Sequence, residues 1–311
     1  MKLINVTKKI SKVPGYVCLF FLYFLISDAL YASEKPVILL INSNATVEKY
    51  KVAQTEFMKT LNSPVLEVDL GGKEKPGKAL PDNADFVYSI GGKAYLLAKK
   101  HFSEKPIIFS SIINWRRLQP LSRKTYGVSS EVHARMPLFM FRSVFPNIKK
   151  IGVLYSEHYN LQWFRNAREQ ARELGITITG KIVSDKKHTI PALKGLFAEV
   201  DAIWLISDPH VMPEKDYLYK ILKTCDASKM PVFSYLGAFA KIGAVLTVSA
   251  DNPTIGRQAA SIVMQMLSGD KAEEKIQFPA GTHITLNLKK AEAYGLEYNK
   301  NALGLVNNII K

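Results

Sequence analysis

Short, almost uninterrupted apolar runs, each followed by a polar residue and a helical pattern, constrain this chain most. Examples are Val37–Ile41, Phe86–Ile90, Ile151–Tyr155 and Ala202–Ile206. Runs of this length without regular polar alternation are typical of strands covered on both faces of a parallel sheet. Their alternation with helices predicts an open α/β sheet with right-handed crossovers.

The strand–helix pattern runs from Val37 to about residue 126 and starts again near Ile151, which indicates two halves of similar plan. A chain of 311 residues is long for one hydrophobic core and comfortable for two. We therefore expect two α/β lobes, with a change of domain between 126 and 147.

The N-terminus has the composition of a secretory signal peptide. Four lysines precede the apolar run Tyr16–Ile26, and Ala32 supplies a small residue for cleavage. The run of about 11 residues is well short of the roughly 20 that span a bilayer. We expect residues 1–32 to be removed and the protein to be periplasmic, with an uncleaved N-terminal anchor as the alternative.

After this cleavage one cysteine remains, Cys225, which cannot form an internal disulfide and which we expect to be a buried structural thiol. The formal net charge of +15 becomes about +12. Such a charge leaves open an anionic ligand, an acidic partner, an anionic membrane surface or simply a solvated basic surface. The Lys and Arg residues are dispersed and no nucleic-acid-binding motif accompanies them, so no nucleic-acid partner is expected.

The segment 231–271 reads as two strands followed by a polar cap at Asp251 and a long helix. Together with other segments it resembles the ABC-transporter substrate-binding proteins, in particular the branch that includes tryptophan- and tyrosine-binding members. The segments that carry the resemblance are IGVLYSEHYN, VDAIWLISDPHV, MPVFSYLGAFAKIGA, NPTIGRQAA and ITLNLKKAEAYGL.

The resemblance implies a two-lobed type 1 periplasmic-binding (Venus-flytrap) fold, in which each lobe is an open parallel sheet flanked by helices. It further implies that the chain passes between the lobes three times. The expected assignment is 36–126 plus 247–270 for lobe 1, 127–246 plus 271–290 for lobe 2, and 291–311 for a C-terminal tail.

Ligands of open α/β sheets bind beyond the carboxyl ends of the strands, where loops and helix N-termini converge. This rule predicts ligand-binding residues in both lobes: Ser43, Ser89, Gly91, Gly92, Lys93, Ser110 and Ser111 in the first, and Ser156, Tyr159, Ser207, Asp208 and Tyr235 in the second.

Three of these positions carry more specific expectations. The amides after Gly91 favour an anion such as a carboxylate, although a tight turn alone would explain the glycines. Asp208 is expected to pair with a ligand ammonium or to cap the next helix. Tyr235, with Tyr159 and Trp115, is expected to form an apolar slot or to serve only in packing.

Enzyme motifs are absent from the sequence. The six histidines show no metal-ligand spacing, and no G-x-S-x-G elbow occurs. We expect no catalytic residue, metal or cofactor, and a monomer that carries a small ligand, an amino acid or related small carboxylate, to an ABC permease in the inner membrane. The alternatives are a ligand-sensing module for a membrane receptor or histidine kinase and, less favoured, a secreted α/β enzyme.

Overall fold

The computed structural model describes residues 36–311 except 62, 73–79, 271 and 273. The expected signal peptide, 1–32, lies outside the described residues. Residues 37–311 form one compact unit that contains two sheets. Among the described residues, no helix is both long and apolar enough to cross a membrane.

The first sheet has six strands in the order β11-β5-β4-β3-β1-β2, and every pairing in it is parallel. Its strands are β1 (Ile38–Asn42), β2 (Val65–Asp69), β3 (Phe86–Ile90), β4 (Ile107–Ser110), β5 (Thr125–Val128) and β11 (Ile276–Gln277). Its helices are α2 (Glu48–Thr60), α3 (Gly92–His101), the 3-10 helix η1 (Trp115–Leu118) and α8 (Asn252–Leu267).

The second sheet has seven strands in the order β13-β12-β10-β9-β8-β6-β7. They are β6 (Lys150–Tyr155), β7 (Thr177–Ile182), β8 (Ala202–Leu205), β9 (Val232–Ser234), β10 (Leu246–Ala250), β12 (Thr282–Asn287) and β13 (Asn308–Ile310). The pairing is parallel except between β10 and β12. The accompanying helices are α4 (Arg135–Val144), α5 (Glu157–Glu173), η2 (Lys186–His188), α6 (Thr189–Lys194), α7 (Lys215–Ala227), η3 (Gly237–Ile242), α9 (Leu288–Ala293) and η4 (Lys300–Leu305).

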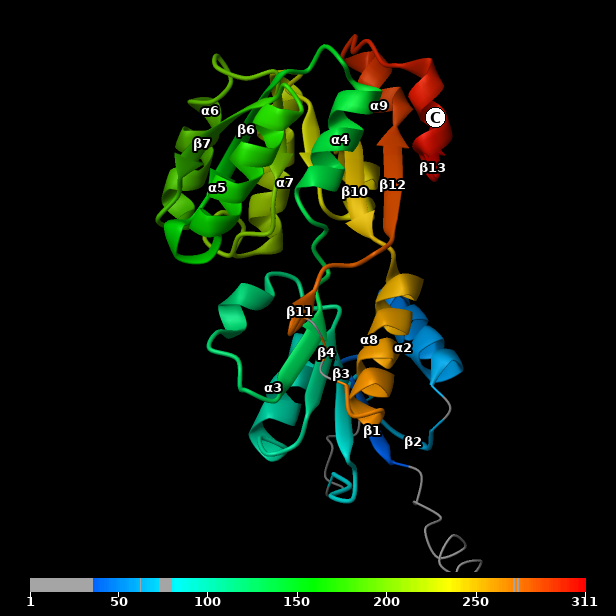
Figure 1. Ribbon diagram of the computed structural model, residues 1–311. Coiled ribbons are helices and arrows are strands. Elements are labelled where there is room, and N and C mark those ends of the chain that lie inside the picture. The colour runs from blue at the N-terminus through cyan, green and yellow to red at the C-terminus, as the bar shows by residue number, and fades with distance from the viewer. Residues whose placement is uncertain (1–35, 62, 73–79, 271, 273) are drawn as a thin grey trace, which may run out of the picture. The chain divides into compact units, whose positions relative to one another are not determined.

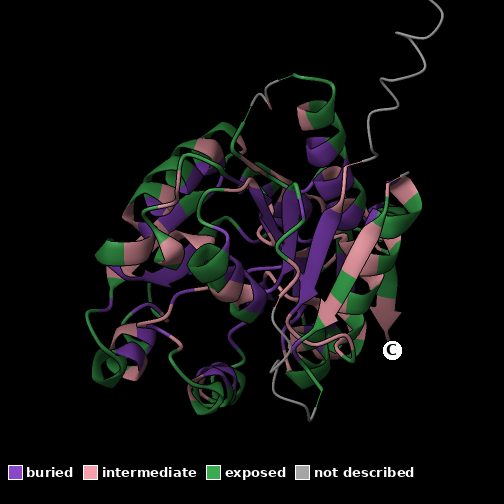
Figure 2. Ribbon diagram, turned by 90° about the horizontal axis from the view of Figure 1, so that it is seen from below, coloured by how far each residue is buried: buried purple, intermediate pink, exposed green. Residues whose placement is uncertain are grey.

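The apolar runs occur because each sheet is covered on both faces, as predicted. Successive residues of a strand point to opposite faces. In β1, Ile38 and Leu40 join one core cluster, whereas Leu39 and Ile41 join another. Figure 2 shows the buried strands at the centre, with exposed residues concentrated on the outer sides of the helices. The expected fold class, two parallel-sheet α/β lobes flanked by helices, is confirmed.

Strand pairing differs from the expected lobe ranges in four places. β5 ends at Val128 and belongs to the first sheet, although residues from 127 were expected in lobe 2. β10 pairs with β9 and β12 in the second sheet, although 247–270 was expected in lobe 1. Within 271–290, β11 joins the first sheet, and the expected tail 291–311 supplies β13 to the second. Membership of a sheet depends on the ladder partner, which an apolar pattern does not reveal.

Helix α8 returns from the second sheet to pack against α2 in the first lobe (Figure 1). As expected, Asp251 caps this helix by accepting a hydrogen bond from the Thr254 amide at 3.0 Å, and Pro253 lies in the first turn. Gly256 faces α2 so closely that a Cβ atom there would clash with the carbonyl oxygen of Ala53. The backbones of α2 and α8 are thus in direct contact at Gly256 and Ala53.

Candidate functional site

Gly91 and Ser43 shape the turn from β3 to α3 in the first lobe. Gly91 has φ of 84°, and its amide donates to the carbonyl oxygen of Ser110 at 2.9 Å. A Cβ atom at Gly91 would approach Ser43 Oγ to 2.6 Å, so both the dihedral angle and the space favour glycine. Ser43 Oγ accepts a hydrogen bond from the Ala94 amide at 3.0 Å and thereby satisfies a donor in the first turn of α3.

Lys93, the cation expected near an anion, already has a partner. Its Nζ donates to the carbonyl oxygen of Leu70 at 2.6 Å, and the residue is otherwise exposed. Gly92 is half-buried, and the Arg117 guanidinium lies 3.5 Å from the position of a Cβ atom there. This hydrogen bond therefore supports a structural role for Lys93, which connects α3 to the residue after β2.

The serines at the ends of β3 and β4 are buried in the sheet. Ser89 Oγ donates to the carbonyl oxygen of Ile108 at 3.2 Å, and Ser110 Oγ lies 2.7 Å from the Tyr88 hydroxyl. Burial raises the pKa of Tyr88, so this phenol stays protonated. Ser111 has φ of 59° and a buried Oγ without a partner among the described residues.

Asp208 organises the carboxyl ends of β6 and β8 in the second lobe. Its Oδ2 accepts hydrogen bonds from the Ser156 amide at 2.7 Å, Ser156 Oγ at 2.8 Å and Asn160 Nδ2 at 2.7 Å. Its Oδ1 accepts from the amides of His210 and Val211. Asp208 is 2% exposed, and these five donors of the protein take the place of water around its carboxylate. This arrangement favours a structural role, in the turn after β8 and at the start of α5, over pairing with a ligand ammonium. Asp208 does not cap the next helix, α7, whose N-cap is Glu214.

Tyr159 lies half-buried in a group of three rings. Its ring centroid is 4.5 Å from that of His158 and 5.2 Å from that of His210. Neither Tyr159 nor Trp115 lines any of the three cavities described below, whereas Tyr235 lines all of them. The slot expected from these three aromatic residues therefore forms no part of the three cavities and stays a prediction.

Tyr235 follows β9 and is half-buried. Burial raises the pKa of its phenol to about 12, a hydrogen bond with Ser207 lowers it, and the nearby Glu131 carboxylate raises it further. The hydroxyl is therefore a neutral donor or acceptor at physiological pH.

Three cavities meet at Tyr235. The largest, about 530 Å³, is lined by Lys49, Val52, Ile113, Ser130, Tyr235, Leu236, Gly237, Ala238, Ser249, Ala250, Asp251, Asn252, Pro253 and His283. A second, about 370 Å³, includes Asn114, Arg117, Ser207, Asp208, Glu214 and Lys215 in its lining. A narrow third cavity, about 30 Å³, is bordered by Trp163 and Trp204 with Glu131 and Asn160. The two larger volumes are within the range of small-molecule sites.

Sequence reasoning missed several polar residues at these cavities. Asn114 lies between β4 and η1. Its backbone N–H donates to Glu131 Oε1 at 2.8 Å, and its side-chain Nδ2 donates to the Ser207 carbonyl oxygen at 3.0 Å. The Glu131 carboxylate also pairs with Arg116. Asn160 Nδ2 reaches Ser207 as well as Asp208. Asn114 follows the Ser110-Ser111 strand end closely, which is the one sequence signal that could have identified it.

Groups for metal binding are absent from the described part of the chain, where no three His, Cys, Asp or Glu side chains are placed to hold an ion. Cys225 is buried, as expected, and burial raises the pKa of its thiol to about 12. A protonated, buried thiol is a poor nucleophile and a poor metal ligand.

Comparison with known proteins finds a matching family. The family model described as ABC transporter substrate binding protein matches residues 77–309. A search of curated proteins found no match.

Solved structures of similar fold include a Streptococcus pneumoniae ABC domain in complex with L-Trp, at 18% identity and TM-score 0.63, covering 89% of this chain and 100% of that one. Another is the ligand-free, open form of a Clostridium difficile substrate binding protein with adhesive properties, at 17% identity and TM-score 0.64, covering 86% and 97%. A conserved domain protein of Vibrio cholerae matches at 16% identity and TM-score 0.62, covering 88% and 99%. At these identities the likeness concerns the fold.

Proposed function

Because the chain belongs to the family of ABC transporter substrate-binding proteins, we propose that it is the periplasmic solute receptor of an ABC importer. It binds an amino acid or a related small carboxylate between its two lobes and presents the loaded form to a permease in the inner membrane. Residues 1–32 direct its export.

The observation that carries this proposal is the composition of the largest cavity. Residues at the start of α2 and α8 contribute to it from the first lobe, and the segment after β9 contributes from the second. A solute held there touches both lobes and therefore binds the closed arrangement more tightly than the open one. This difference in affinity determines how far binding shifts the lobes toward closure. The L-Trp complex of the S. pneumoniae protein supports an amino acid as the first candidate.

The geometry supports a different division of roles from the one expected along the sequence. Tyr235, Ser207 and Asp208 all line cavities that reach the first lobe. Tyr235 and Ser207 remain proposed ligand contacts, whereas the Asp208 carboxylate already accepts five hydrogen bonds from the protein. Ser43, Ser89, Gly91, Gly92, Lys93, Ser110 and Ser111 in the first lobe, and Ser156 and Asp208 in the second, are proposed to hold the loops that frame the site.

A ligand screen on the exported protein tests the proposal. The full-length chain is expressed with its own N-terminus, collected from the periplasm, unfolded to release bound solute and refolded. Thermal unfolding is then followed with amino acids, small carboxylates, sugars and purines. A ligand that binds only the native state raises its stability by about 2.7 kcal/mol at 100 times its Kd.

A stabilising amino acid or carboxylate, together with loss of its uptake in a strain that lacks this chain, is the expected result. Stabilisation without any uptake defect would contradict the importer role and support the sensory alternative. No response from folded, solute-free protein to any compound would contradict solute binding itself.

A further inference from the structure

Lys49 is the cation that lines the largest cavity. It lies in the first turn of α2, where the cavity of about 530 Å³ reaches the first lobe. The other ionisable residues of the lining are Asp251, Tyr235 and His283. Lys49 and Asp251 are thus the lysine and the carboxylate of this lining.

Among the described residues, Lys49 forms neither a hydrogen bond nor an ion pair; its contact is with the face of the Tyr50 ring, 5.0 Å from Nζ to the centroid. Burial lowers the pKa of the Lys49 ammonium, and no nearby carboxylate opposes that change. A partly desolvated ammonium without a counter-ion is unfavourable, and a bound anion would remove that cost.

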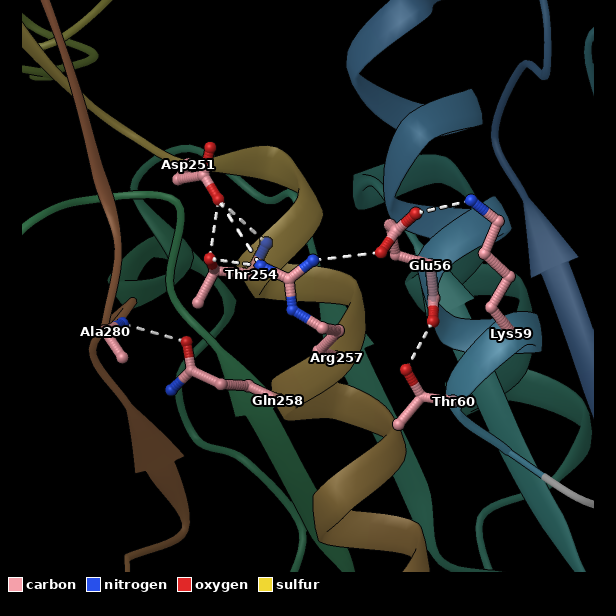
Figure 3. A network of polar contacts seen from close by, with 8 residues as sticks. All are labelled: Glu56, Lys59, Thr60, Asp251, Thr254, Arg257, Gln258 and Ala280. Atoms are coloured by element: carbon pink, nitrogen blue, oxygen red, sulfur yellow. Dashed lines mark hydrogen bonds and ion pairs between the residues drawn. The ribbon is translucent and has the colours of Figure 1, made fainter.

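Asp251 is not available as this counter-ion. Its Oδ2 accepts hydrogen bonds from the amide and the hydroxyl of Thr254, at 3.0 and 2.5 Å, and lies 3.9 Å from Arg257 Nη2. Figure 3 shows the carboxylate directed toward these two side chains. The negative charge is thus used to cap α8, which leaves the cavity with one uncompensated positive charge.

On the basis of the proposed function, we propose that this cavity takes a solute with a carboxylate group, and that the carboxylate pairs with Lys49. The contrast with Lys93 supports the choice, because Lys93 donates to the Leu70 carbonyl oxygen and does not line the cavity. The anion subsite therefore lies at the start of α2 and not at the turn before α3.

Matched ligands and matched variants test this assignment. The probes are the twenty L-amino acids and small monocarboxylates, the primary amide of each, and uncharged sugars and purines. Binding is measured by calorimetric titration on wild-type protein and on Lys49→Met, Lys49→Arg and Lys51→Met. Lys51 is an exposed lysine of the same helix and serves as the control.

We expect a carboxylate to bind and its amide to bind far more weakly. Lys49→Met should weaken carboxylate binding by about tenfold to hundredfold, as expected for loss of a charge-assisted hydrogen bond. Lys49→Arg should keep much of the affinity, and Lys51→Met should keep all of it.

Equal binding of carboxylate and amide, or unchanged affinity in Lys49→Met, would overturn the role of Lys49 while solute binding stands. Binding of sugars or purines alone would do the same. If folded wild-type protein bound none of the probes in the titration, the proposed function and this inference would both be overturned. Should Lys49→Met not fold, Lys49→Gln with an unchanged melting temperature takes its place.

Discussion

Asn114 of the first lobe donates a hydrogen bond from Nδ2 to the carbonyl oxygen of Ser207 in the second, at 3.0 Å. Asn114 is 1% exposed and has φ of 48° and ψ of 59°, a left-handed conformation that asparagine tolerates better than most residues. The backbone N–H of Asn114 donates a hydrogen bond to Glu131 Oε1, which holds the backbone of this residue in place. The side chain of this residue thus joins the two lobes, and its backbone is bound to the segment between β5 and α4.

Replacing Asn114 separates these two roles. Asn114→Gly keeps the left-handed backbone but removes the Nδ2 donor, and we expect solute affinity to fall about fivefold, as one neutral hydrogen bond across the lobes would imply. Asn114→Ala should lose the same affinity and about 1 kcal/mol more of unfolding free energy, because Cβ disfavours the left-handed region. Titration and urea unfolding measure both effects. Wild-type affinity in the glycine variant would show that the bond does not stabilise the closed form.

Asp208 should matter for stability more than for charge recognition. In Asp208→Asn one acceptor oxygen becomes an NH₂ group that faces donors, so at least two of the five hydrogen bonds are lost. We expect a loss of about 3 kcal/mol in unfolding free energy. Asp185→Asn, in an exposed cap of η2, should cost much less, because asparagine is also a good cap residue. Similar small losses in both variants would contradict the assignment of Asp208 as a buried structural centre.

The sequence predicted most strands and helices because each sheet is covered on both faces. It did not predict α4 (Arg135–Val144), because the expected change of domain covers these residues. The first turn of this helix contains Pro137, which a helix start tolerates. The resemblance placed the crossings before the end of β5, within β10 and before β11, whereas strand pairing keeps β5 and β11 in the first sheet and β10 in the second.

The site was harder to predict because side-chain direction decides its chemistry. The strand-end rule selected Lys93 and not Lys49, yet Lys93 reaches a carbonyl oxygen and Lys49 lines the largest cavity. Asp208 follows a buried strand as ligand-binding residues do, but the protein satisfies both of its oxygens. Asn114 depends on a left-handed backbone that no local motif specifies.

Tyr235 should make stability decrease at alkaline pH. Its pKa is raised to about 12 in the folded protein, above the usual value near 10. A group with a raised folded-state pKa stabilises below its unfolded value, and that contribution disappears as pH rises from about 10 to about 12. Tyr235→Phe should therefore show a shallower decrease over this range, by up to about 2 kcal/mol. Tyr219→Phe, at an exposed position, is the control. Parallel curves for Tyr235→Phe and wild type would contradict the shift.

The N-terminal assignment predicts the mass of the exported protein. Cleavage after Ala32 should yield a periplasmic chain that begins at Ser33, and Ala32→Arg should prevent this cleavage because the site requires a small residue. Mass spectrometry of the periplasmic and membrane fractions distinguishes the outcomes. A full-length chain found only in membranes would support the uncleaved anchor instead.

The contact between α2 and α8 should depend on Gly256 more than on the ion pairs around it. Arg257 pairs with Glu56 at 2.9 Å and belongs to the polar network in Figure 3, but it is half exposed. We expect Arg257→Ala to cost at most about 1 kcal/mol. Gly256→Ala instead places a methyl group against the Ala53 carbonyl oxygen and forces the helices apart.

This overpacking should cost about 2 kcal/mol or more, despite the better helix propensity of alanine. Gly304→Ala, where a Cβ atom meets open space, is the matched control and should leave unfolding free energy nearly unchanged. Since both helices contribute residues to the largest cavity, Gly256→Ala should also weaken binding of the solute found in the screen. Wild-type stability in Gly256→Ala would mean that α8 can shift along α2 without loss, and that the cavity does not depend on their close approach.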